Sequence, residues 1–95
     1  MDNTKKVLIV CKDFKSVKVW LHNVLDIYMD IGLVTTWNSK KNKICMLGNY
    51  VWYFKEKSDI SDSTKYYKVM TDDDLEKEWE ERGWNEHKVQ SDGES

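Results

Sequence analysis

Residues 6–32 read KVLIVCKDFKSVKVWLHNVLDIYMDIG, and this stretch contains two different hydrophobic patterns. Lys6–Lys12 is a continuous apolar run rich in valine, which predicts a strand buried on both faces and therefore central in a sheet. The apolar residues that follow recur at helical spacing, at Phe14, Val17, Leu21, Val24, Tyr28 and Ile31. This stripe predicts an amphipathic helix, with Asp13 capping its start and Gly32 ending it.

Four further strands are predicted downstream of this helix. They are expected at Leu33–Asn38, Lys43–Leu47, Tyr50–Lys55 and Tyr66–Met70, where β-branched and aromatic residues gather. Gly48 and Asn49 separate two of these runs and are typical of a two-residue hairpin turn. The polar segment Glu56–Lys65 predicts a loop.

A second helix is predicted to begin after Thr71 and to end at Gly83. The Thr71 hydroxyl and the Asp74 carboxylate are placed to form a capping box, and Gly83 favours the left-handed conformation past the last turn. The resulting order is β-α-β-β-β-β-α. It predicts an α+β domain over residues 1–89, with a small antiparallel sheet, one packed amphipathic helix and an acidic C-terminal helix at the sheet edge. Residues 90–95 are expected to form a flexible tail.

Length and composition indicate one regular domain. The chain has 95 residues, no proline and four glycines, and its twelve aromatic residues supply large buried area for a small core. Cys11 and Cys45 lie in apolar runs without the spacing of a disulfide framework, so we expect two reduced core thiols and a cytoplasmic location. The apolar run near the N-terminus is too short for a signal peptide or a membrane span.

The charges of the chain are divided between its two halves. Residues 1–55 contain nine lysines against four aspartates, a net charge of +5, whereas residues 56–95 contain thirteen acids against six bases, a net charge of −7. Such asymmetry concerns binding partners rather than the fold. It indicates a surface that meets a strongly charged molecule.

The acidic helix, TDDDLEKEWEER at residues 71–82, is the main candidate site. Aspartates in its first turn suit the helix dipole, but Glu80 and Glu81 in its last turn oppose the dipole, and such a cost is expected where a residue has a function. The predicted partner-binding residues are Asp72, Asp73, Asp74, Glu76, Glu78, Trp79, Glu80, Glu81 and Trp84. The alternative is an ordinary solvated helix. The spacing of the acids matches no known metal-binding loop, so neither a metal site nor a cofactor is predicted.

The lysine-rich half provides a second candidate, a nucleic-acid-binding surface. Its predicted residues are Lys15, Lys18, Lys40, Lys41 and Lys43, with Trp37 or Tyr50 available to stack a base. The alternative is a solvated rim in which lysines protect sheet edges. A third interpretation is homo-oligomerisation, in which the basic face of one copy meets the acidic helix of another.

No catalytic motif is present. The sequence contains no phosphate loop, dinucleotide-binding turn, nucleophile elbow or paired metal-binding histidines, and neither His22 nor His87 has a partner at diagnostic spacing. Residues 6–25 are similar to the strand and helix of the motif Ia region in superfamily 2 helicases. Because the phosphate loop is missing, this similarity implies no ATPase activity.

These observations lead to the hypothesis of a non-enzymatic interaction protein. Its acidic helix is expected to act as a nucleic-acid mimic that occupies a basic groove of a larger protein, without involvement of a membrane. The small size, the many aromatics and the lysine- and glutamate-rich composition resemble proteins encoded by bacteriophages. That resemblance implies inhibition of a host nucleic-acid-processing or defence enzyme. The alternative is a small nucleic-acid-binding accessory protein that uses its lysine-rich half.

Overall fold

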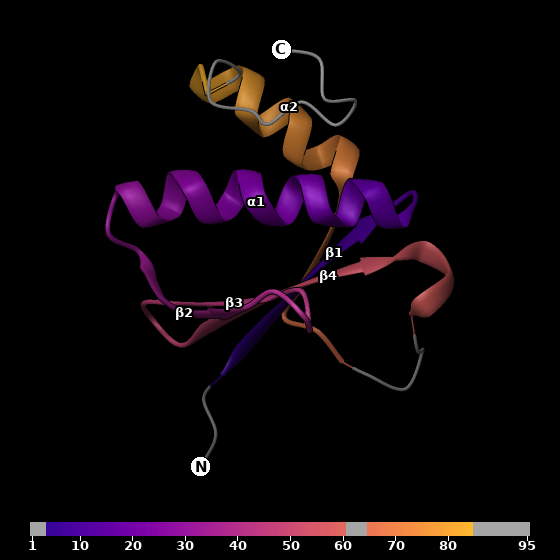
Figure 1. Ribbon diagram of the computed structural model, residues 1–95, viewed down its shortest axis with the longest axis horizontal. Helices are drawn as coiled ribbons and strands as arrows, with labels where there is room; N and C mark the ends of the chain where they lie inside the picture. The colour runs from indigo at the N-terminus through magenta and orange to yellow at the C-terminus, as the bar shows by residue number, and fades with distance from the viewer. Residues whose placement is uncertain (1–3, 61–64, 85–95) are drawn as a thin grey trace.

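The computed structural model describes residues 4–60 and 65–84, which form a five-stranded sheet with two helices on one of its faces (Figure 1). Along the chain the elements are β1 (Lys5–Cys11), α1 (Phe14–Asp30), β2 (Val34–Asn38), β3 (Lys43–Met46), β4 (Tyr50–Glu56), the single-turn helix η1 (Lys57–Asp59), β5 (Lys68–Thr71) and α2 (Asp72–Arg82). This confirms the predicted α+β class and the order of the strands and helices. The predicted tail at residues 90–95 lies outside the described residues.

The sheet is mixed rather than purely antiparallel, which corrects the expected pairing. Its strand order is β2-β3-β4-β1-β5, with β2, β3 and β4 antiparallel and β1 parallel to both of its neighbours. β4 and β5 run in the same direction on either side of β1, so a tight hairpin cannot join them, and residues 57–67 form the longer connection. The prediction that the first strand is central is confirmed, since β1 lies between two other strands.

Local sequence fixes the ends of both helices as predicted. The Ser16 backbone N–H donates a 2.8 Å hydrogen bond to the Asp13 side chain, and this bond lowers the pKa of the Asp13 carboxyl. At the start of α2, the Thr71 hydroxyl accepts from the Asp74 amide and the Asp74 carboxylate accepts from the Thr71 amide, each at 3.1 Å. Gly83 ends α2 at φ 73°, a conformation that favours glycine.

The hairpin turn lies at Gly48 and Asn49 as predicted, but its loop has three residues rather than two, because Met46 pairs with Tyr50 and leaves Leu47, Gly48 and Asn49 between the strands. Gly48 and Asn49 have positive φ angles of 82° and 64°. A side chain at Gly48 would also approach the Tyr50 ring to 3.3 Å. The turn therefore sets the register in which β3 pairs with β4.

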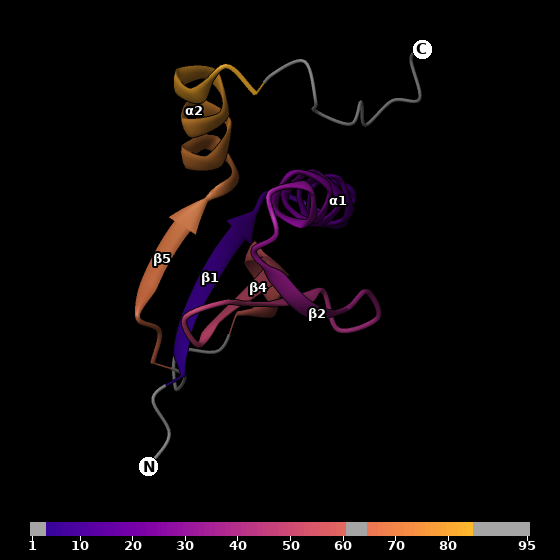
Figure 2. The ribbon, with the colours of Figure 1, turned by 90° about the vertical axis from the view of Figure 1, so that its left-hand side faces the viewer.

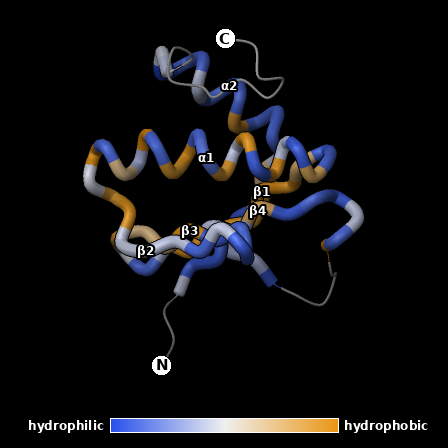
Figure 3. Tube along the Cα trace, in the orientation of Figure 1, coloured by the Kyte–Doolittle hydropathy of each residue, from blue (hydrophilic) through white to orange (hydrophobic). Residues whose placement is uncertain are grey.

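The core lies between the sheet and the two helices. Val7, Ile9 and Cys11 point from β1 toward the helices, and Val17 and Leu21 of α1 pack on that face. The two helices differ in hydropathy, because α1 alternates between hydrophobic and hydrophilic positions, whereas α2 is hydrophilic along most of its length (Figure 3). Few apolar residues thus hold α2 in place.

The position of α2 follows from its direct connection to β5. Thr71 is both the last residue of β5 and the cap of α2, so the helix leaves the end of the strand without a loop (Figure 2). Within the described residues α2 contacts β5 and β1. It consequently lies beyond the end of β5 and next to α1 (Figure 2), with one side facing the core and the other facing solvent.

Candidate partner-binding face

The solvent side of α2 carries five exposed carboxylates, which we call the acidic face. They are Asp73, Asp74, Glu76, Glu80 and Glu81. Lys77 is exposed on the same helix and offsets one of these charges. Seven of the nine predicted site residues are acids, and this face contains five of those seven.

The core side of α2 is formed by Leu75 and Trp79, both with no solvent exposure. The Trp79 ring lies 5.3 Å from Trp20 and 5.0 Å from Trp84, each edge to face, and stacks against Tyr28 at 6.3 Å between centroids. The prediction that Trp79 contacts a partner is therefore corrected, because its side chain is already enclosed by the protein's own aromatic residues. Its function is to fix α2 on the core.

The three remaining predicted site residues, two in α2 and one just after it, have structural contacts. Asp72 is 9% exposed, and its carboxylate accepts a hydrogen bond from the Lys12 amide at 3.2 Å, which joins α2 to the end of β1. Glu78 is half-buried and forms an ion pair with Arg82 at 3.7 Å. Trp84 is half-buried, with the Arg82 guanidinium 5.0 Å from its ring centroid. Asp72 is thus removed from the partner-binding surface, and Glu78 and Trp84 lie at its margin.

The predicted lysine surface is only partly assembled. The Lys18 ammonium donates to the Ser39 carbonyl at 2.8 Å and to the Asn42 side chain at 2.6 Å, so this lysine ties α1 to the turn between β2 and β3. Lys43 is half-buried, whereas Lys15, Lys40 and Lys41 are exposed. Lys18 thus joins α1, which carries Lys15, to the turn that carries Lys40 and Lys41. The charge of Lys18 itself is engaged within the protein.

Cys11 lies in the core as predicted, whereas Cys45 is not part of the core. Burial, together with the nearby carboxylates of Asp72 and Asp13, raises the pKa of the Cys11 thiol to about 12. The nucleophilic form of cysteine is the thiolate, so Cys11 is a neutral core thiol at pH 7, as predicted. Cys45 is half-buried and unbridged. In this part of the chain no three His, Cys, Asp or Glu side chains are grouped to hold a metal ion.

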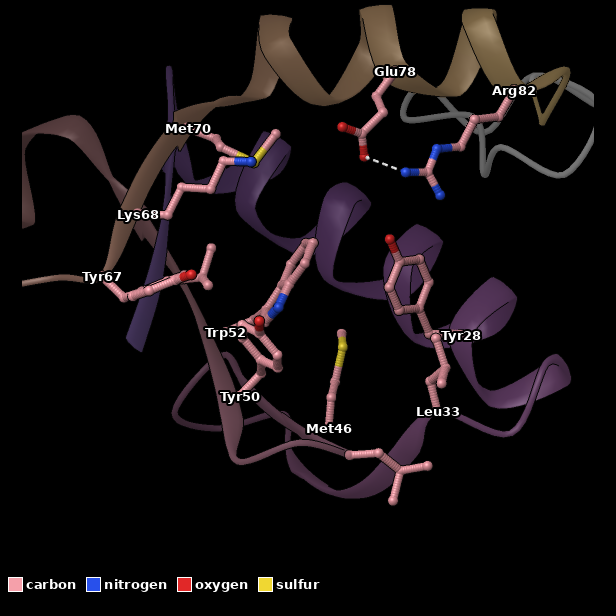
Figure 4. A pocket seen from close by; sticks show the side chains of 12 residues that line it. Tyr28, Leu33, Met46, Tyr50, Trp52, Tyr67, Lys68, Met70, Glu78 and Arg82 are labelled. Atoms are coloured by element: carbon pink, nitrogen blue, oxygen red, sulfur yellow. Dashed lines mark ion pairs between the residues drawn. The ribbon is translucent and has the colours of Figure 1, made fainter. Parts of the chain in front are cut away.

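A groove that the sequence did not predict lies beside α2 on the helix-covered face of the sheet (Figure 4). We call it the aromatic groove, and its apolar lining includes Tyr28, Leu33, Met46, Tyr50, Trp52 and Tyr67. Its volume is about 540 Å³. The only indication in the sequence is the density of aromatic residues in β4 and just before β5, and composition alone attributes these residues to the core.

Comparison of the chain with protein-family models, with curated proteins and with solved structures finds no match. Among the described residues, no helix is both long enough and apolar enough to cross a membrane. A functional assignment therefore depends on the geometry of the chain's own surface.

Proposed function

We propose that this protein is a non-enzymatic interaction protein whose acidic face binds a basic groove on a larger partner. The observation that supports this most is the separation of the two sides of α2. Leu75 and Trp79 hold the helix from within, and the acidic face points away from the core. The backbone that carries these carboxylates loses little conformational freedom on binding, because the helix is ordered beforehand.

The charge density of this face supports nucleic-acid mimicry. Asp73 to Glu81 spans eight residue steps, or about 12 Å at 1.5 Å per residue. The five carboxylates and Lys77 give a net charge of −4 over that length, about one charge per 3 Å. One strand of B-DNA carries one phosphate per about 3.4 Å of helix axis. The face thus approximates the charge spacing of a single nucleic-acid strand.

The mechanism is competition for arginine and lysine side chains. Carboxylates form charge-assisted hydrogen bonds with guanidinium and ammonium groups, which are the groups that otherwise bind phosphates. A basic channel occupied by α2 is closed to its substrate. The role that follows is inhibition of a nucleic-acid-processing or defence enzyme, consistent with the resemblance to bacteriophage proteins.

Salt dependence of partner capture tests this proposal. The tagged protein is incubated with a bacterial lysate at about 0.1 M and about 1 M NaCl, and the captured proteins are identified by mass spectrometry. The screening length falls from about 10 Å to about 3 Å between these conditions, so we expect capture of a nucleic-acid-binding protein at low salt and its loss at high salt. A partner that stays bound equally well at both concentrations would show that the contact is not made by the acidic face.

A further inference from the structure

The aromatic groove has an apolar floor and walls from both layers of the protein. Met46, Trp52 and Val7 lie in three adjacent strands of the sheet, Tyr28 comes from α1, and α2 closes the upper side (Figure 4). The centroids of the Tyr28 and Trp52 rings are 5.6 Å apart, so aromatic side chains form the floor of the groove. Leu47 and Tyr67 at the mouth are 55% and 63% exposed. Exposed apolar side chains beside a groove are typical of a ligand site.

The charged groups around the groove are mostly cations. Lys68 and Arg82 line it, and the Lys5 ammonium lies 5.0 Å from the Tyr50 ring centroid and 5.7 Å from that of Tyr67. Among the described residues on this rim, Glu78 is the acid, and its ion pair with Arg82 neutralises only one of these three cations. The groove is therefore net positive, in contrast to the acidic face on the other side of α2.

Tyr28 adds a hydrogen-bond donor. Burial raises the pKa of the Tyr28 phenol, with Arg82 opposing and Glu78 reinforcing that shift. The phenol is consequently protonated at neutral pH and offers its O–H to an acceptor in the groove. Figure 4 shows the Tyr28 hydroxyl and the Arg82 guanidinium directed toward the same region.

We propose that the aromatic groove binds a small organic anion with a flat apolar body and one acidic group. The body packs on Trp52, Tyr50 and Tyr67, and the acidic group interacts with Lys68, because Arg82 is already paired with Glu78. A volume of about 540 Å³ is within the range of roughly 300–1,000 Å³ found for small-molecule pockets and is too small for a folded partner. The excess of cations selects an anion over a neutral or basic ligand of the same shape. This site is independent of the acidic face.

The test uses two dyes that differ only in charge. 8-Anilinonaphthalene-1-sulfonate has a flat apolar body with a sulfonate, and N-phenyl-1-naphthylamine is the same body without it. We expect saturable one-to-one binding of the sulfonate dye to the folded protein, about tenfold weaker in Lys68→Glu because a hydrogen bond to a charged group is lost. Lys77→Glu makes the same charge change on α2 outside the groove and is expected to leave binding unchanged. The uncharged dye is expected to bind both variants equally.

Amide chemical-shift mapping locates the dye. Shifts are expected at Leu33, Leu47 and Tyr67, and near-ultraviolet circular dichroism confirms that each variant is folded. Equal weakening by Lys68→Glu and Lys77→Glu, shifts confined to residues outside the groove, or the absence of saturable binding would each overturn the proposal. Lys68→Glu is also expected to leave partner capture by the acidic face intact, so the two proposals can fail separately.

Discussion

Replacing Trp79 with alanine is expected to destabilise the protein by about 3–5 kcal/mol, a large share of the stability of a domain this size. The side chain has no solvent exposure and contacts Trp20, Tyr28 and Trp84, so its removal leaves a cavity lined by three rings. Urea unfolding followed by far-ultraviolet circular dichroism measures the loss. The same substitution is expected to abolish any activity that depends on the position of α2.

Two further variants test whether the loss of stability comes from the buried Trp79 ring. Trp37→Ala is the matched control, because Trp37 is 49% exposed on β2 and is expected to cost less than about 1 kcal/mol. Trp79→Phe keeps a ring in the cluster and removes the indole N–H, a buried donor without a hydrogen-bond partner among the described residues. Its cost is therefore expected to be well below that of Trp79→Ala. If Trp79→Ala and Trp37→Ala cost the same, α2 does not pack on the core as described.

Reversing three carboxylates of the acidic face is expected to weaken partner binding by about 100-fold. The combined variant is Glu76→Lys, Glu80→Lys and Glu81→Lys. An exposed ion pair contributes about 0.5 kcal/mol, and reversal replaces each attraction by a comparable repulsion, which gives about 3 kcal/mol for three sites. Binding to the captured partner is measured by isothermal titration calorimetry at about 0.1 M salt.

The control for this variant carries the same change in net charge elsewhere. Asp26, Asp30 and Asp59 are exposed and outside α2, so their replacement by lysine is expected to leave partner affinity nearly unchanged. Lysines at positions 80 and 81 suit the C-terminal end of the helix dipole, so α2 is expected to stay folded, and far-ultraviolet circular dichroism checks this. Unchanged affinity of the α2 variant would remove the acidic face from the interface. A gain of nucleic-acid affinity instead would favour the alternative based on Lys15, Lys40 and Lys41.

The local elements of the fold could be predicted because their causes are local. The cap at Asp13, the capping box of Thr71 and Asp74 and the turn at Gly48 each depend on residues within four positions of one another. The strand pairing could not be predicted in the same way. β1 is inserted between β4 and β5. Nothing in the sequence of β4 or β5 specifies that it pairs with β1, which lies far away along the chain.

The candidate site was predictable to the same limited extent. Helical spacing places Leu75 and Trp79 on a different side of α2 from most of the acids, but it does not show that the core already encloses Trp79. The sequence suggests a nucleic-acid-binding role for Lys18. Its contact with Asn42 contradicts that role but joins residues that are 24 positions apart, so local sequence gives no sign of it. The aromatic groove was missed because its lining comes from both helices and several strands, a combination that appears only after folding.

Competition with nucleic acid tests the central claim most directly. A fluorescein-labelled DNA is bound to the captured partner, and its anisotropy is followed as the protein is added at constant salt. We expect the anisotropy to fall to that of free DNA, because the carboxylates of α2 and the phosphates occupy the same basic groups. If the protein binds the partner while the DNA stays bound and a ternary complex forms, α2 does not occupy the nucleic-acid site and the account is wrong.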